Sequence, residues 1–327
     1  MSVEVLMLGF NNFGDKSDLL PLRSAENNFR VLRELITHEQ AGISAHAGEN
    51  IIEHHDLDAR DARQEIRDMI QKCKTKGSQL LIYITGHGVV SSSSEDEFFV
   101  VPTAGSTIET AREGHSDFCL RIETDLYAEL EKPGAPTAAV ILDCCNANAS
   151  NRRGERNSSN AMLGVDDGFS GAMLPGGGAA SYSVVSTSGS RQSAWESSWS
   201  ELSPCKGGLR KTYQRIGLGE DVRISNFIGA LVDVWGLSEI RLPSDFDRLM
   251  EGSGPGEMFH FQAASNLNEV LNQTREGLVS VVNAANGAKK LLQSVDNSSL
   301  KQSVSVREPK GPAARLPLFR LPSPSRE

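Results

Sequence analysis

Two residues of this chain, His87 and Cys145, have the types that thiol-based catalysis requires. A cysteine attacks a carbonyl carbon only as the thiolate, and an unperturbed thiol pKa of about 8.5 leaves little thiolate at neutral pH. A histidine that lies close in space can remove this proton and later protonate the leaving amine. Cys145 is therefore a candidate nucleophile and His87 its candidate general base.

Both residues also have an ordinary structural interpretation. A single histidine in a loop is usually structural, and a cysteine after a buried strand usually packs in the core. Their joint placement after two strand-like segments favours the catalytic interpretation. Glycines on both sides of His87 let the backbone turn sharply there. Cys144 is the competing nucleophile, because it directly precedes Cys145.

The segments around this pair alternate between strand-like and helix-like patterns. Short apolar runs typical of buried strands occur at Val3–Phe10, Gln79–Thr85 and Ala138–Leu142. Apolar residues recur at helical spacing in Ala25–Ile36, and again after Asp58, which is placed as a helix N-cap. This alternation predicts an α/β fold with a mostly parallel sheet covered on both faces.

The carboxyl ends of parallel strands gather at one edge of such a sheet, and ligands bind outside that edge. His87 follows one predicted strand and Cys145 follows the next strand-like run along the sheet. We therefore expect the two side chains to meet at this edge.

The later part of the chain changes in composition. Residues 146–180 are rich in Gly, Ser and Asn and predict a long loop. Further strands are predicted at Glu97–Val101, Ser181–Thr187 and Met258–Gln262, and helices at Ile122–Leu130 and Ser225–Trp235.

An apolar stripe from Leu267 to Ala285 predicts a longer helix, with Asn266 and Glu269 placed like a capping box. This stripe either packs on the core or binds a partner. It belongs to a predicted helical extension over residues 263–305, which a proline-rich tail follows at residues 306–327.

Composition narrows the class of protein. The chain has 327 residues and a net charge of −9, which gives no indication of nucleic-acid or anionic-membrane binding. It shows no bilayer-length apolar run and no secretory signal, so we expect a cytoplasmic protein. Five cysteines, two of them adjacent, make no disulfide framework, and the histidines, including His54–His55, show no zinc-site spacing.

Several motifs resemble those of the caspase and metacaspase clan. Tyr83–Gly88 (YITGHG) is similar to the Tyr-Ser-Gly-His-Gly motif of metacaspases, and Asp143-Cys144-Cys145 resembles their Asp-x-Cys motif. Cys145 follows His87 by 58 positions, which suits the clan, in which caspases place the histidine about 50 residues upstream of the cysteine. Further similar segments are Val5–Asn11, Leu22–Asn28, Lys132–Gly134, Ser186–Ser188 and Ala194–Trp195, so that the resemblance covers roughly residues 3–262.

The resemblance implies a caspase-hemoglobinase-like three-layer αβα sandwich, with a large-subunit-like part over residues 1–150 and a small-subunit-like part over 181–262. It implies a cysteine endopeptidase that acts on protein or peptide substrates, stays latent until activated, and works in regulated cell death or defence. Cys145 would be the nucleophile and His87 the base. The backbone amides of Gly88 and Cys145 would form an oxyanion hole, worth about 3–4 kcal/mol per donor.

For substrate specificity the resemblance gives two answers. In metacaspases the Asp of Asp-x-Cys lines the S1 pocket, so Asp143 favours Arg or Lys at P1 by charge complementarity. The second acid of that pocket falls on Asn28, whereas Arg23 lies where a caspase-type reader of P1 Asp would lie. Ser186 belongs to the strand that builds the substrate groove. The segment Asn146-Ala147-Asn148 departs from the usual His-Ser-Gly.

Activation, cofactors and partners complete the expectations. Arg152, Arg153 and Arg156 are candidate self-cleavage sites if S1 is acidic, Asp166 and Asp167 if it is not, and an uncut loop is the ordinary alternative. We expect no cofactor, because no loop shows the dense carboxylate spacing of a calcium site. For the enzyme, an activating partner protein is a further expectation, with the C-terminal helix as its binding site. The other hypotheses are a catalytically silent scaffold that binds a partner through the 266–285 helix, and another hydrolase. The lack of a Gly-x-Ser-x-Gly elbow weakens the latter.

Overall fold

The computed structural model describes the chain in several stretches, separated by segments of uncertain placement. The described residues are 2–37, 50–93, 96–145, 147, 182–188, 196–198, 219, 222–238, 278–294, 303–307 and 316–320.

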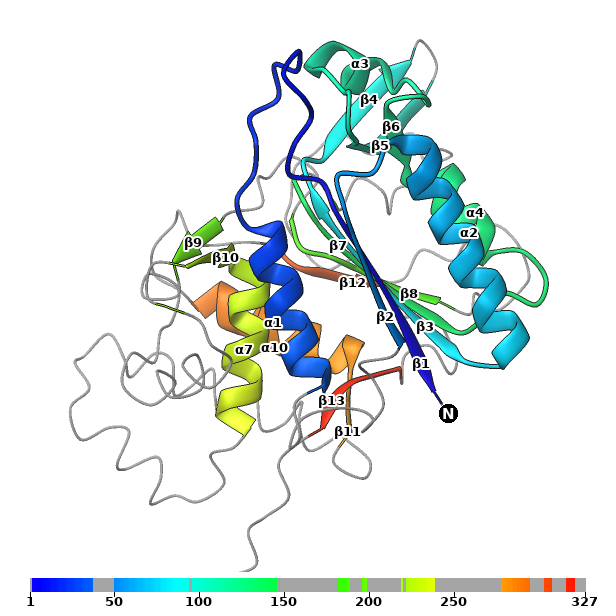
Figure 1. Ribbon diagram of the computed structural model, residues 1–327. Coiled ribbons are helices and arrows are strands. Elements are labelled where there is room, and N and C mark those ends of the chain that lie inside the picture. Colours follow the sequence, from blue (N-terminus) through cyan, green and yellow to red (C-terminus); the bar gives the residue numbers. More distant parts are fainter. Residues whose placement is uncertain are drawn as a thin grey trace, which may run out of the picture.

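A six-stranded sheet forms the centre of the described structure (Figure 1). Its strands, in spatial order, are β12 (Ser305–Arg307), β8 (Tyr182–Ser186), β7 (Ala138–Cys144), β3 (Gln79–Gly86), β1 (Val3–Gly9) and β2 (Ile51–His55). All neighbours pair in parallel except β12, which runs antiparallel to β8. The predicted α/β fold with a mostly parallel sheet is therefore confirmed.

The strands β1, β3 and β7 are apolar along nearly their whole length because both faces of the sheet are covered there. Along β1, Val5 and Met7 enter one core cluster, whereas Leu6 and Leu8 enter the other. This alternation follows from the two-residue period of a strand.

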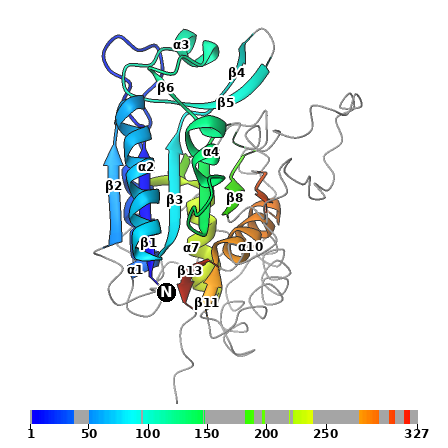
Figure 2. The ribbon, with the colours of Figure 1, turned by 90° about the vertical axis from the view of Figure 1, so that its right-hand side faces the viewer.

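Helices on the two faces complete three layers (Figure 2). The helices α1 (Ala25–Thr37), α7 (Asn226–Ser238) and α10 (Val281–Ser294) supply residues to the cluster that contains Val5. The helix α2 (Ala59–Lys76), the π-helical turn η2 (Ile122–Tyr127) and α4 (Ala128–Leu130) supply residues to the cluster that contains Leu6.

Helix α2 has the boundaries that its sequence predicts. The Asp58 carboxylate accepts a hydrogen bond from the amide of Asp61 at 2.8 Å and so caps the first turn. Gly77 ends the helix in the left-handed conformation, at φ 63°. Both ends therefore satisfy backbone groups that a helix leaves unpaired.

A smaller antiparallel sheet lies beyond the carboxyl edge of the central one, at the top of Figure 1. It consists of β4 (Val89–Ser93), β5 (Asp96–Pro102) and β6 (Cys119–Arg121), with α3 (Ile108–Glu113) between the last two strands. The strand predicted at Glu97–Val101 is confirmed, since these residues lie within β5.

The predicted helix over residues 266–285 is wrong in its position. Leu278 lies in strand β11 (Leu278–Ser280), which pairs with β13 (Pro317–Arg320), and helix α10 starts only at Val281. The local sequence pattern did not reveal strand β11, because its pairing with β13, a segment far along the chain, determines the structure there. Residues 266–277 lie outside the described residues, as do the predicted strand Met258–Gln262 and the boundary at 262.

The apolar residues of α10 face the core. Val281, Ala284, Ala285 and Leu291 are buried in the same cluster as residues of α1 and α7. In the described part of this helix, the core-packing interpretation of the stripe is therefore the correct one. The remaining two-stranded sheet joins β9 (Glu196–Ser198) to β10 (Arg223–Ser225).

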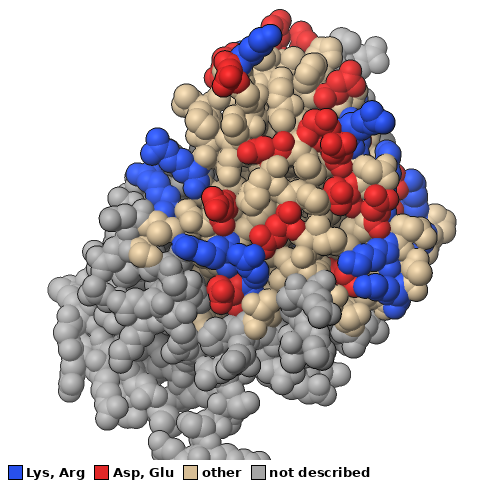
Figure 3. Space-filling view, viewed as in Figure 1, with Lys and Arg blue, Asp and Glu red and all other residues tan. Residues whose placement is uncertain are grey.

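The surface toward the viewer in Figure 3 carries acidic and basic side chains side by side rather than in separate regions. None of the helices in the described stretches is both long and apolar enough to cross a membrane.

Candidate active site

His87 and Cys145 leave the central sheet at neighbouring points. Strands β3 and β7 pair in parallel, and their last register pair is Gly86 with Cys144. His87 directly follows β3, and Cys145 directly follows β7. The fold therefore brings the predicted base and nucleophile to the same place at the carboxyl edge of the sheet.

The residue after the histidine packs directly against the cysteine. A Cβ atom built on Gly88 would lie 1.9 Å from the carbonyl oxygen of Cys145 and 2.8 Å from the Phe99 ring. Real Cβ atoms do not approach a backbone oxygen this closely, so only glycine fits at position 88. The contact holds the two backbones together where the predicted oxyanion hole lies.

A backbone carbonyl fixes the orientation of the His87 ring. Nε2 of His87 lies 2.7 Å from the carbonyl oxygen of Leu20, and the ring lies against that of Phe13, with 5.3 Å between centroids. Because a carbonyl oxygen can only accept, Nε2 carries the proton in this contact. Nδ1 is then the nitrogen that remains to accept a proton from a thiol.

The segment that carries Leu20 is itself anchored at the carboxyl edge of the sheet. The Asp56 carboxylate accepts hydrogen bonds from the amides of Asn11 at 2.6 Å and Asn12 at 2.9 Å. Asp56 adopts φ 54°, an uncommon conformation for a residue other than glycine. Its side chain thereby fixes the start of the segment at the end of β2.

The small sheet anchors the middle of the same segment. The Ser17 hydroxyl donates to the carbonyl of Ser106 at 2.6 Å, and the Asp18 carboxylate accepts from the amide of Ile108 at 2.7 Å. The amide of Gly105 donates to the carbonyl of Phe13 at 3.0 Å. Three contacts with residues 105–108 thus support the loop that holds His87.

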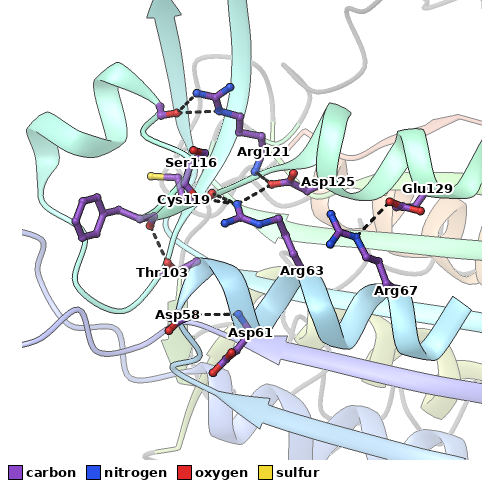
Figure 4. Close-up of polar contacts among 12 residues, drawn as sticks. Asp58, Asp61, Arg63, Arg67, Thr103, Ser116, Cys119, Arg121, Asp125 and Glu129 are labelled. Atoms are coloured by element: carbon purple, nitrogen blue, oxygen red, sulfur yellow. Dashed lines mark hydrogen bonds and ion pairs between the residues drawn. The ribbon is translucent and has the colours of Figure 1, made fainter.

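Helix α2 in turn contacts the chain on both sides of β6 (Figure 4). Arg63 donates to the carbonyl of Ser116 at 2.7 Å and forms an ion pair with Asp125 at 3.3 Å. Arg67, one turn further along α2, pairs with Glu129 at 3.3 Å. A series of contacts therefore connects His87, through the segment that carries Leu20 and residues 105–125, to helix α2.

The two adjacent cysteines differ in environment. Cys144 is fully buried, and its Sγ lies 3.7 Å from the carbonyl oxygen of Ile84. Burial, with the nearby Asp143 charge, raises the pKa of the Cys144 thiol well above its usual value, so this thiol stays protonated at neutral pH. Cys145 is only partly buried. Of the two thiols, Cys145 is the more accessible.

Asp143 lies two residues before Cys145, and its side chain is 3% exposed. Its carboxylate accepts hydrogen bonds from the hydroxyls of Tyr83 at 2.7 Å, Thr187 at 2.8 Å and Ser225. Burial, reinforced by this carboxylate, raises the pKa of Tyr83 well above its usual value and keeps its hydroxyl as a donor. Hydrogen bonds from these donors stabilise the charged form of a buried carboxylate.

The other residues predicted for S1 lie in different settings. Asn28 is buried, and its side-chain oxygen accepts from the amide of Ser225 at 2.9 Å, so Asn28 and Asp143 meet at Ser225. Ser186 is buried at the end of β8, opposite Leu142. Arg23 is exposed just before α1. The candidate cleavage residues Arg152, Arg153, Arg156, Asp166 and Asp167 lie outside the described residues.

The sequence reasoning missed the residues that hold the site. Leu20 acts through its backbone carbonyl, which has no signature in the sequence. Thr187 ends the predicted strand Ser181–Thr187 and Ser225 begins the predicted helix Ser225–Trp235, so the only available signal was that each lies at the boundary of a predicted element. Tyr83 stood within the histidine motif without an assigned role.

The comparisons with known proteins give little beyond this geometry. No family model matches the chain, and neither does any curated protein. Among solved structures, the chain is similar to caspase-1 from Spodoptera frugiperda, with 9% sequence identity, coverage of 94% of this chain and 88% of that chain, and a TM-score of 0.48. A similarity this low assigns neither an activity nor a residue.

Proposed function

We propose that this chain is a caspase-like cysteine endopeptidase with Cys145 as nucleophile and His87 as general base. The observation that carries the proposal is the register of β3 and β7, which ends on Gly86 opposite Cys144, so that His87 and Cys145 are the residues that directly follow two paired strands. The Leu20 carbonyl supports it, because a third group that orients the base is typical of an activated nucleophile.

The proposed reaction follows from these groups. Nδ1 of His87 takes the Cys145 proton, and the thiolate attacks the carbonyl carbon of the scissile peptide bond. The amides of Gly88 and Cys145 stabilise the oxyanion, at about 3–4 kcal/mol per donor. The imidazolium then protonates the leaving amine, and water hydrolyses the thioester with His87 again as base. This sequence of steps requires no cofactor.

For P1 we propose a basic residue, because Asp143 is an acidic side chain two positions before the nucleophile. This carboxylate already accepts hydrogen bonds from the hydroxyls of Tyr83 and Thr187. A cationic P1 side chain would therefore interact with a carboxylate whose negative charge these hydroxyls also stabilise. The exposed Arg23 is the basis for the alternative preference, Asp at P1.

The biological setting is part of the same proposal. We propose a cytoplasmic enzyme that is latent until a signal, a partner or cleavage within residues 146–180 activates it, and that acts in regulated cell death or defence. Intact-mass analysis after incubation tests the cleavage, since Arg152, Arg153 and Arg156 give fragments different from those of Asp166 and Asp167.

A fluorogenic peptide panel with Arg, Lys or Asp at P1 tests the enzyme and its preference together. Wild type should cut the basic substrates, and Cys145→Ala should abolish cutting. Cys144→Ala is the matched control and should retain it. No cutting by wild type on any substrate, with or without calcium or prior proteolysis, would reject the proposal in favour of a silent scaffold. Activity that survives Cys145→Ala and disappears in Cys144→Ala would reject the nucleophile assignment.

A further inference from the structure

We infer that Thr187 and Ser188, which directly follow β8, are positioning residues for Cys145. We call this pair the Thr187–Ser188 clamp. The inference rests on the proposed function, because the residue that the clamp would position is the proposed nucleophile. Both residues are fully buried, and neither was singled out as a site residue by sequence reasoning.

The Ser188 hydroxyl contacts the backbone on both sides of Cys145. Its Oγ donates to the carbonyl of Cys144 at 2.6 Å and accepts from the amide of Ala147 at 3.0 Å. A serine hydroxyl supplies one donor and two acceptor positions, and here both roles are used at once. One side chain therefore spans the turn in which Cys145 lies.

Thr187 fixes the two residues before that turn. Its amide donates to the carbonyl of Leu142 at 3.1 Å, which continues the β7–β8 ladder past its last pair, Leu142 with Ser186. Its hydroxyl donates to Oδ1 of Asp143 at 2.8 Å. Together the clamp residues make four hydrogen bonds to positions 142, 143, 144 and 147, which bracket Cys145.

These contacts matter because Cys145 itself lies just beyond the strand. The ladder between β3 and β7 ends at Cys144, so the strand pairing does not fix the nucleophile's own residue. A misplacement of about 1 Å in a reacting group can cost about 100-fold in rate. The buried Ser188 hydroxyl, which bonds Cys144 and Ala147, would prevent such a displacement of Cys145.

Two pairs of substitutions distinguish the effect of losing the hydroxyl group from the effect of changing the volume of the side chain. Ser188→Ala removes both hydrogen bonds, whereas Ser188→Thr keeps a hydroxyl. Thr187→Val is nearly isosteric but lacks the donor, whereas Thr187→Ser keeps it. Ser183→Ala is the matched control, because Ser183 is a buried serine of the same strand whose Oγ has no hydrogen-bond partner among the described residues.

We expect Ser188→Ala to lower kcat about 10- to 100-fold with KM little changed, by the same factor for Arg, Lys and Asp at P1. Ser188→Thr and Thr187→Ser should recover most of the rate, and Ser183→Ala should match wild type. The rate at which iodoacetamide alkylates Cys145 at neutral pH, followed by peptide mass spectrometry, should fall most in Ser188→Ala and least in Ser183→Ala. A displaced Cys145 thiol no longer lies where His87 can take its proton, so less of it is the reactive thiolate.

The outcomes distinguish this inference from the proposed function. If wild type cuts no peptide, the proposed function fails, and the alkylation rates still test the clamp. Equal kcat and equal alkylation rates for Ser188→Ala and Ser183→Ala would overturn the inference. So would a loss confined to one P1 class, which would make the clamp a specificity element. If Ser188→Ala does not fold, Thr187→Val against Thr187→Ser decides.

Discussion

At the scale of single residues, the site depends on groups that have little room to change. Gly88 lies against the Cys145 carbonyl, and His87 is held between Phe13 and the Leu20 carbonyl. Such closely determined positions are expected where reacting groups must be held in one geometry.

We predict that Gly88→Ala lowers the proposed peptidase activity about 100-fold or more. The added Cβ would lie 1.9 Å from the Cys145 carbonyl oxygen, so the backbones that carry base and nucleophile must separate. The matched control is Gly219→Ala, whose nearest neighbour would be a Val222 methyl group at 3.7 Å. Peptide cleavage rates and melting temperatures check this, and a fully active Gly88→Ala protein would contradict the described packing.

A second residue-scale prediction concerns the buried carboxylate. Tyr83→Phe removes one donor from Asp143, and a buried charged acceptor that loses a hydrogen bond costs about 1–3 kcal/mol. We expect the free energy of unfolding in urea to fall by about this amount. Tyr182→Phe is the control, since its hydroxyl bonds the less buried Glu131 at 3.0 Å and its loss should cost less. Equal losses would show that the Tyr83–Asp143 bond adds nothing particular to stability.

At the scale of elements, the predictions from sequence succeeded where local pattern and tertiary structure agree. The strands β1, β3 and β7 are apolar runs buried on both faces, and α2 carries its own cap and stop signals. The predicted dyad follows from the ends of two of these strands. The helix placed over residues 266–285 failed because Leu278–Ser280 pairs with β13, a partner that no local pattern reveals.

The N-cap of α2 gives an element-scale prediction. Asp58→Ala should lower the free energy of unfolding by about 1 kcal/mol, because the Asp61 amide loses its acceptor. Asp58→Ser should restore most of this loss, since serine is an equally good cap. Urea titrations of the three proteins check it. If Asp58→Ala is as stable as wild type, the cap seen at the start of α2 contributes nothing measurable.

At the scale of the whole molecule, stability should depend on pH through Glu4 of β1. Burial alone would raise the pKa of Glu4, but hydrogen bonds and charges from Lys72 and Lys76 outweigh it and lower this pKa below its ordinary 4.5. The two lysines lie 2.7 Å and 3.0 Å from the carboxylate. A carboxyl group whose pKa is lowered by folding stabilises the native state above its unfolded pKa, and this contribution is lost as the pH falls through the folded pKa.

We therefore expect the free energy of unfolding to decline as the pH falls below 4.5. Urea titrations at a series of pH values check this. Glu4→Gln should be less stable at neutral pH and should show a shallower decline, because glutamine does not titrate. A Glu4→Gln protein whose decline parallels that of wild type would show that other carboxyl groups control the acid transition.

The two core clusters differ in how much of the chain they require. Among the described residues, the cluster around Leu6, α2 and β7 extends no further along the chain than Val184, whereas the cluster around Val5, α1 and α7 also takes in Val304, Leu316 and Leu318. During synthesis, one face of the sheet can be covered early. The cluster that takes in α1 is complete only once Leu318 has been made, although α1 is among the first parts made. A nascent chain should therefore complete the two cores at different stages of translation.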